Sequence, residues 1–89
     1  MKVYLIGAGP GDPGLLTLKA ARIIPQCDAI VYDDLIPEEV LLLAGPDAER
    51  HYLGKRAGRD YMKQPQINEL IKSIELNGKK VARIKGGDP

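Results

Sequence analysis

The sequence has no phenylalanine, no tryptophan and only one cysteine. It also has no apolar run long enough to cross a bilayer. A single cysteine, Cys27, excludes a disulfide framework and a thiolate metal cluster. The net charge of +1 creates no field that would favour nucleic acid or a membrane surface. We therefore expect a cytoplasmic chain without a nucleic-acid or membrane partner, and we assign no metal site.

The chain has 89 residues, enough for one small domain, and its apolar fraction of 44% is that of an ordinary globular protein. Without Phe or Trp, the core has to be built from Ile, Leu, Val and four tyrosines. The chain stops inside the loop signal "KGGDP". We therefore expect residues 1–89 to be a fragment of a longer protein.

Short apolar runs alternate with segments of helical spacing along the chain. The apolar runs predict buried strands at 3–6, 29–32, 51–53 and 81–84. Helical spacing predicts helices at 15–24, from Pro37 to about Ala44, and from Pro65 to the stop signal Asn77-Gly78. The first helix is capped either by Asp12, with Pro13 at the first helical position, or by Thr17, and it is stopped by Pro25.

The order β-α-β-α-β-α-β predicts an α/β fold, with a parallel β-sheet flanked by helices and right-handed crossovers. In such a sheet the loops that follow the strands lie along one edge, where open α/β sheets bind ligands. The unusual segments of this sequence all follow predicted strands: "GAGPGDPG", "DD", "GKRAGR" and "GGDP". This asymmetry predicts a site at the carboxyl edge of the sheet.

The first of these loops resembles a dinucleotide-binding turn, but it is poorly suited to a phosphate. Asp12 stands where the G-x-G-x-x-G template has its third glycine, and a carboxylate there would repel a pyrophosphate. Pro10 and Pro13 remove two N–H donors. The loop either makes a tight strand-to-helix turn or admits the close approach of a ligand without phosphates.

Two further loops carry charged candidates. Asp33 and Asp34 either make a solvated turn or supply a general base, since a carboxylate can act as one when its surroundings raise its pKa. Lys55, Arg56 and Arg59 form either a surface patch or a grip for a ligand with several carboxylates.

The loop after the fourth strand contains Gly86, Gly87 and Asp88. It is either a turn or a second place where backbone groups and a carboxylate meet a ligand. His51 is expected to be a packed or surface histidine, and Cys27 a small semi-buried apolar residue.

Taken together, these segments resemble the tetrapyrrole methyltransferases, and within that family the enzymes that methylate uroporphyrinogen III. The matching stretches are "VYLIGAGPGDPGLLTLKAARII", "DAIVYDDLI", "YLGKRAG", "QINELI" and "KVARIKGGDP". The glycine loop is shared by several tetrapyrrole methylases, whereas "VYDxL" followed by "GKRAG" is more particular to the uroporphyrinogen enzymes.

The resemblance implies an enzyme that uses S-adenosyl-L-methionine, leaves S-adenosyl-L-homocysteine, and binds the cofactor between two α/β domains, usually as a homodimer. It implies methylation of two pyrrole carbons of uroporphyrinogen III to give precorrin-2, which leads to sirohaem and cobalamin. By motif position, Asp33 is the implied proton acceptor and Lys55 the implied proton donor. The implied cofactor contacts are Pro10, Gly86, Gly87 and Asp88. The basic loop would give Arg56 and Arg59 to the substrate carboxylates.

Some residues depart from the family pattern. Asp34 stands where an arginine is common, and "RDYMKQPQIN" replaces the commoner "RHSxPQEEIN". These changes put the substrate contacts of that segment in doubt. Another precorrin methyltransferase, and a receiver-like signalling module with an acidic pair and a lysine, remain as alternatives. Typical family members are far longer, so the resemblance implies that residues 1–89 are the N-terminal α/β domain, truncated at the "GGDP" loop, with the second domain absent. We expect this chain to be inactive alone.

Overall fold

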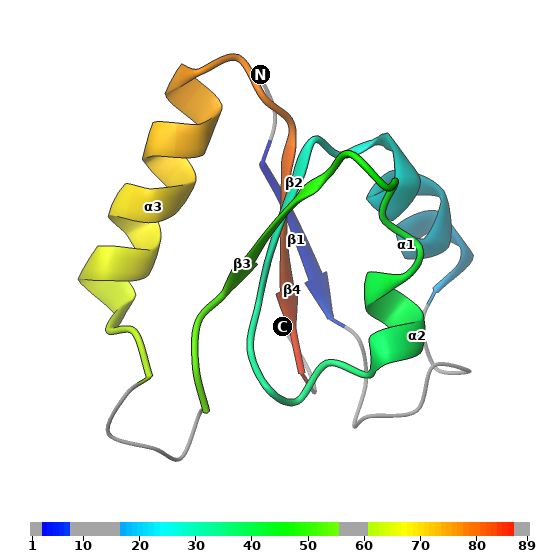
Figure 1. Cartoon of the computed structure of the whole chain (residues 1–89), viewed down its shortest axis with the longest axis horizontal. Coiled ribbons are helices and arrows are strands. Elements are labelled where there is room, and N and C mark those ends of the chain that lie inside the picture. The colour runs from blue at the N-terminus through cyan, green and yellow to red at the C-terminus, as the bar shows by residue number, and fades with distance from the viewer. Residues whose placement is uncertain (1–2, 8–16, 56–60, 87–89) are drawn as a thin grey trace.

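The computed structural model describes residues 3–7, 17–55 and 61–86. The four strands are β1 (Val3–Gly7), β2 (Ala29–Tyr32), β3 (Glu49–Tyr52) and β4 (Val81–Lys85). They form one sheet in the order β1-β4-β2-β3, and every neighbouring pair is parallel. The strand arrows accordingly point to the same edge of the sheet (Figure 1). The predicted α/β fold with a parallel sheet is confirmed.

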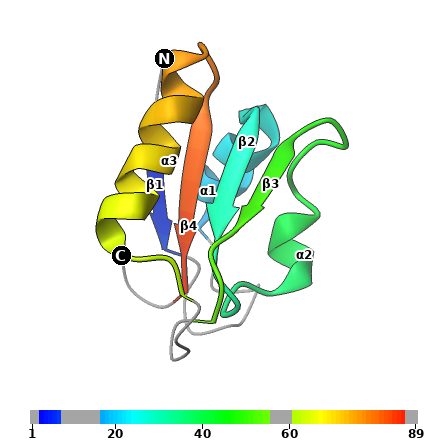
Figure 2. The same cartoon turned by 60° about the vertical axis from the view of Figure 1, so that its left-hand side comes forward.

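The helices are α1 (Leu18–Ile23), α2 (Glu38–Leu41) and α3 (Gln64–Leu76), and the single 3₁₀ turn η2 (Ile24–Gln26) extends α1. Figures 1 and 2 show α1 and α2 on one face of the sheet and α3 on the other. The chain steps across the sheet from β1 to β2 to β3 and then returns to β4. Right-handed crossovers in opposite directions place their helices on opposite faces, which explains the two layers.

Each face of the sheet has its own apolar core. The buried residues beneath α1 and α2 are Ile6, Ala20, Ile24, Cys27, Ile30, Ile36, Val40, Ala44, Ala82 and Ile84. Those beneath α3 are Ala29, Val31, Leu53, Ile67, Ile74 and Val81. Because β2 and β4 are central, their residues are buried on both faces. The unbroken apolar run of β2 predicts this burial, whereas β4 also buries Arg83. At the edge strand β1, Leu5 is 70% exposed.

The first helix shows which of its two predicted caps is used. Thr17 is the N-cap, and its Oγ1 accepts a hydrogen bond from the Ala20 N–H at 3.1 Å. The helix ends at Ile23, just before Pro25, which was predicted to stop it. Pro25 itself lies in η2. Leu18 is 79% exposed, because the inward side of the helix follows Ala20 and Ile24.

Other boundaries shift by a few residues. α2 is shorter than predicted, and β3 begins two residues earlier, at Glu49, because pairing with β2 extends to Ala29. The N-terminus of α3 is closed by a bond of 3.0 Å from the Lys63 N–H to Gln66 Oε1. Asn77 is the C-cap of this helix, and the next residue, Gly78, has the positive φ of 78° that the stop signal predicts.

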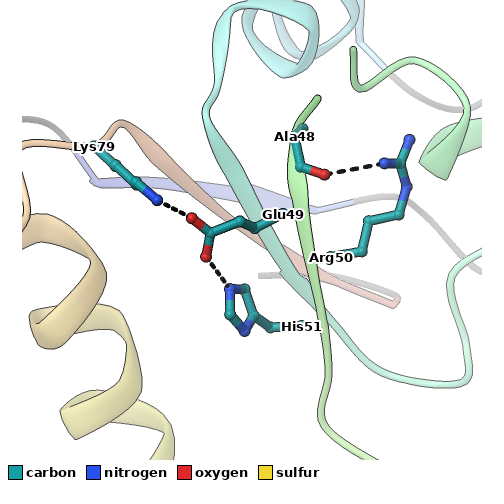
Figure 3. Close-up of polar contacts among 5 residues, drawn as sticks. All are labelled: Ala48, Glu49, Arg50, His51 and Lys79. Carbon is teal, nitrogen blue, oxygen red and sulfur yellow. Dashed lines mark hydrogen bonds and ion pairs between the residues drawn. The ribbon is translucent and has the colours of Figure 1, made fainter. Parts of the chain in front are cut away.

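The amino end of β3 carries a polar cluster (Figure 3). Glu49 forms ion pairs with Lys79 and, at 2.9 Å, with His51 Nε2. The Lys79 hydrogen bond, followed by the His51 bond, lowers the pKa of Glu49. This cluster lies at the opposite end of the strand from the predicted site, so His51 has the structural role expected for it.

Candidate functional site

The loops that follow β2, β3 and β4 meet at the carboxyl edge of the sheet. The Leu53 N–H donates to Tyr32 O at 2.8 Å, and the Asp34 N–H donates to Gly54 O at 3.3 Å. These two bonds continue the pairing of β2 and β3 beyond the strand ends. They hold the acidic pair beside the start of the basic loop, as the sequence predicts.

Asp33 is the most deeply buried charged residue at this edge, with 1% of its surface exposed. Its Oδ1 accepts a hydrogen bond from the Leu35 N–H at 3.0 Å, and its backbone oxygen accepts one from the Ile36 N–H at 3.3 Å. Asp34, by contrast, is exposed. The structure thus separates the two acids, and Asp33 is the one held in place for chemistry that needs an oriented carboxylate.

Lys55 follows a glycine that this geometry requires. Gly54 has a φ of 103°, a conformation that residues with a Cβ rarely adopt. Its backbone oxygen accepts the hydrogen bond from the Asp34 N–H. Lys55 is exposed and lies one residue beyond the contact. The backbone therefore places Lys55 and Asp33 at the same edge.

Gly86 is buried at the end of β4. A Cβ added there would lie 2.4 Å from the Cβ of Leu35. The absence of a side chain at Gly86 lets the loop after β2 pack directly on the end of β4. This contact brings the third loop into the same site, and it gives Gly86 a packing role that the sequence alone did not reveal.

Two aromatic residues at this edge were missed in the sequence. Tyr32 and Tyr52 are register partners on β2 and β3, and their ring centroids are 5.7 Å apart at an interplanar angle of 47°. Partial desolvation, followed by the charge of Asp34, raises the pKa of Tyr52, whose surface is 51% exposed. Each tyrosine is the last residue of its strand, close to the acidic pair. A tyrosine at the end of two predicted strands was the sequence feature that could have identified them.

A third missed residue is Arg83, which is 4% exposed although it lies in the central strand β4. Its guanidinium donates to the Tyr61 hydroxyl at 3.1 Å. Nothing in a run such as "VARIK" distinguishes this buried arginine from a solvent-exposed one. The burial of Arg83 becomes apparent only in the folded sheet, where β4 lies between β1 and β2.

Several predicted site residues lie outside the described part of the chain. They are Pro10, Arg56, Arg59, Gly87 and Asp88. Of the predicted set, the structure therefore describes Asp33, Lys55 and Gly86, and it brings all three to one edge. Within residues 3–7, 17–55 and 61–86, no group of three or more His, Cys, Asp or Glu side chains could hold a metal ion. No helix among these residues is long and apolar enough to span a membrane.

The family model for Tetrapyrrole (Corrin/Porphyrin) Methylases matches residues 2–89. The chain belongs to this family. Membership decides against the receiver-like alternative, because the match covers almost every residue.

Relatives and solved structures agree with this assignment. The chain is 51% identical over 88 residues to a uroporphyrinogen-III C-methyltransferase of Methanocaldococcus jannaschii, covering 99% of this chain and 36% of that protein. It is 51% identical over 87 residues to the siroheme synthase of Baumannia cicadellinicola, covering 98% of this chain and 19% of that protein.

A solved uroporphyrin-III C-methyltransferase from Thermus thermophilus, complexed with S-adenyl homocysteine, is 42% identical with a TM-score of 0.72. It is matched over 100% of this chain and 34% of its own. The chain thus spans about a third or less of the length of the family members that it matches.

Proposed function

We propose that this chain is the N-terminal part of a uroporphyrinogen-III C-methyltransferase that uses S-adenosyl-L-methionine and makes precorrin-2 for sirohaem and cobalamin. The observation that carries the proposal is the buried Asp33 carboxylate, held by the Leu35 N–H at the carboxyl edge of a tetrapyrrole methylase sheet. Gly54, Lys55 and Gly86 lie at the same edge. The identity of 51% to a relative of this name supports the substrate.

The reaction moves a methyl group from a sulfonium to a pyrrole carbon. S-adenosyl-L-methionine supplies that methyl group, and its sulfur keeps the electron pair of the broken bond. The transfer leaves a positive charge on the ring, which then loses a proton from another position, and we assign Asp33 as the acceptor of that proton. Lys55, at the same edge, is assigned as the proton donor of the site. Holding the two reactants in contact accounts for about 7–11 kcal/mol of barrier reduction in well-oriented systems.

The described residues fit a cofactor that carries a positive charge and no phosphate. The edge contains the Asp33 carboxylate, and the strand end at Gly86 has no side chain. We assign Pro10, Gly86, Gly87 and Asp88 to the cofactor, with S-adenosyl-L-homocysteine as its product. Arg56 and Arg59 are assigned to the substrate, because arginine matches carboxylates bidentately.

The complete enzyme requires a second domain to close the crevice, and we propose that it acts as a homodimer in the cytoplasm without a metal. The test is methyl transfer by the full-length protein from labelled S-adenosyl-L-methionine to uroporphyrinogen III, with the product analysed by mass. We expect the addition of two methyl groups. Transfer only to an already methylated precorrin would instead show another precorrin methyltransferase, and no transfer to any tetrapyrrole would refute the proposal.

A further inference from the structure

Arg83 is a charged side chain in the middle of the sheet. Among the described residues, the buried polar or charged side chains are Asp33 and Arg83. Arg83 lies in β4, in register with Leu5 on one side and Val31 on the other. A buried charge is costly unless it is hydrogen-bonded, so the partners of this guanidinium indicate why it is there.

The two guanidinium contacts connect the sheet to the basic loop. Nη1 donates to Ile84 O at 3.1 Å, which fixes the group to its own strand. Nη2 donates to the hydroxyl of Tyr61 at 3.1 Å. Tyr61 directly follows the segment 55–60 that carries the three cations, Lys55, Arg56 and Arg59. The arginine thus binds the residue at which this segment returns to the sheet.

The base of the segment is closed by backbone bonds as well. The Met62 N–H donates to Leu53 O at 2.9 Å, and the Leu53 N–H donates to Tyr32 O at 2.8 Å. Tyr61 and Met62 also pack against the apolar core beneath α3. These contacts join Leu53, which precedes the basic segment 55–60, to Met62, which follows it. The bond from Arg83 to Tyr61 connects this pair to the central strand β4.

We propose that Arg83 is a positioning residue that, through the Tyr61 hydroxyl, anchors Tyr61 and Met62 to the centre of the sheet. Because Met62 is bonded to Leu53, the anchor steadies the end of β3 that leads to Lys55, and so affects how the basic segment binds the carboxylates of the substrate. The inference rests on the proposed function for its substrate. The anchor itself rests on the geometry alone. Of its two residues, Tyr61 lies in the segment "RDYMKQPQIN", in which this sequence departs from the family pattern, and Arg83 lies in β4.

The central variant is Tyr61→Phe, which removes the hydroxyl and keeps the ring in the core. Tyr4→Phe is the matched control, because Tyr4 is a half-buried tyrosine packed against the core on the other face of the sheet. Arg83→Met removes the donor, whereas Arg83→Lys retains a charged donor and tests rescue. Tyr61→Phe combined with Arg83→Met completes a double-mutant cycle that isolates the contact between the two residues.

Two measurements on the full-length protein separate the anchor from the proposed function. The first is limited trypsin digestion, which reports cleavage after Lys55, Arg56 and Arg59. Loss of a hydrogen bond to a charged group should accelerate this cleavage about tenfold in Tyr61→Phe. The second is steady-state methyl transfer. We expect a higher KM for uroporphyrinogen III, with an unchanged Kd for S-adenosyl-L-methionine.

The expected pattern is faster cleavage and a raised substrate KM in Tyr61→Phe and Arg83→Met, partial recovery in Arg83→Lys, and no change in Tyr4→Phe. The double variant should be no worse than Arg83→Met. Cleavage and KM equal to wild type in Tyr61→Phe would overturn the anchor, even if Arg83→Met does not fold. Faster cleavage in a protein that methylates no tetrapyrrole would support the anchor and refute the proposed substrate.

Discussion

Leu35 and Gly86 are packed so closely that a Cβ added to the glycine would lie 2.4 Å from the Cβ of Leu35. Real side chains do not tolerate such a contact, and the atom in the way is attached directly to the backbone of the loop after β2. The same loop contributes the backbone N–H that bonds to Asp33 Oδ1. A glycine at the end of β4 therefore helps to fix the position of the buried carboxylate.

Gly86→Ala should destabilise the chain by about 1–3 kcal/mol, the usual cost of forcing extra volume into a packed site. Urea unfolding measures this change in the free energy of unfolding. Gly45→Ala is the control, because a Cβ at Gly45 meets nothing within 4 Å and should change stability little. Leu35→Gly combined with Gly86→Ala should recover part of the loss. Equal stabilities for the two alanine variants would contradict the packing role.

Asp33→Asn in the full-length protein should reduce turnover far more than it weakens cofactor binding. Asparagine keeps an oxygen for the Leu35 N–H but cannot accept a proton from the ring, and loss of such a step costs about 10²–10⁴-fold in rate. Turnover with labelled donor and isothermal titration with S-adenosyl-L-methionine separate the two effects. Asp34→Asn changes the exposed neighbour and should have a smaller effect. Unchanged turnover in Asp33→Asn would remove this residue from the mechanism.

The sequence predicts the sheet well because its signals are local. Apolar runs such as 3–6 and 29–32 mark strands, and the chain between these two contains a segment of helical spacing. The direction of the strands follows from this alternation, so the meeting of Asp33 and Lys55 at one edge is also predictable. The choice of Thr17 as the cap of α1 was one of two open alternatives, since both candidates precede a plausible helix start.

The site residues that were missed depend on pairs far apart in the chain. Arg83 and Tyr61 are 22 residues apart, and their bond forms only because α3 returns the chain to the centre of the sheet. The approach of Leu35 to Gly86 likewise depends on β4 lying beside β2. The spacing of apolar residues gives no information about such long-range contacts. A sequence also does not distinguish a glycine that permits close packing from one that makes a turn.

Cys27 should react slowly with thiol reagents while the chain is folded. It is 5% exposed, and burial, followed by the charge of Asp28, raises the pKa of its thiol. Its Sγ–H also donates to Ile23 O at 3.5 Å. Because the thiolate is the reactive form, labelling by a disulfide reagent at pH 8 should be much slower in buffer than in urea. Equal labelling rates in the two solvents would show that this side of the fold opens readily.

The cluster around Glu49 should make stability fall in acid. Lys79 and His51 lower the folded pKa of Glu49, so its contribution is present above the unfolded value of about 4.5 and is lost as the pH falls through the folded pKa. Thermal unfolding of wild type and Glu49→Gln should therefore differ at neutral pH and converge in acid. Glu69→Gln, an exposed change on α3, is the control and should follow wild type throughout. A constant difference at every pH would contradict the ionic origin of the effect.

The isolated 89-residue chain should transfer no methyl group, although the full-length enzyme should. The chain corresponds to 36% of the Methanocaldococcus jannaschii relative, and its described candidate residues lie along one edge of a sheet. In the proposed enzyme, a second domain supplies the opposing wall of the site. Without an opposing wall, donor and ring carbon are not held in contact, and the advantage of about 7–11 kcal/mol from positioning is lost. Both proteins would be assayed with labelled S-adenosyl-L-methionine and uroporphyrinogen III at matched concentrations. Product formed by the short chain would show that residues 1–89 contain the complete site and that the second domain is not needed to close it.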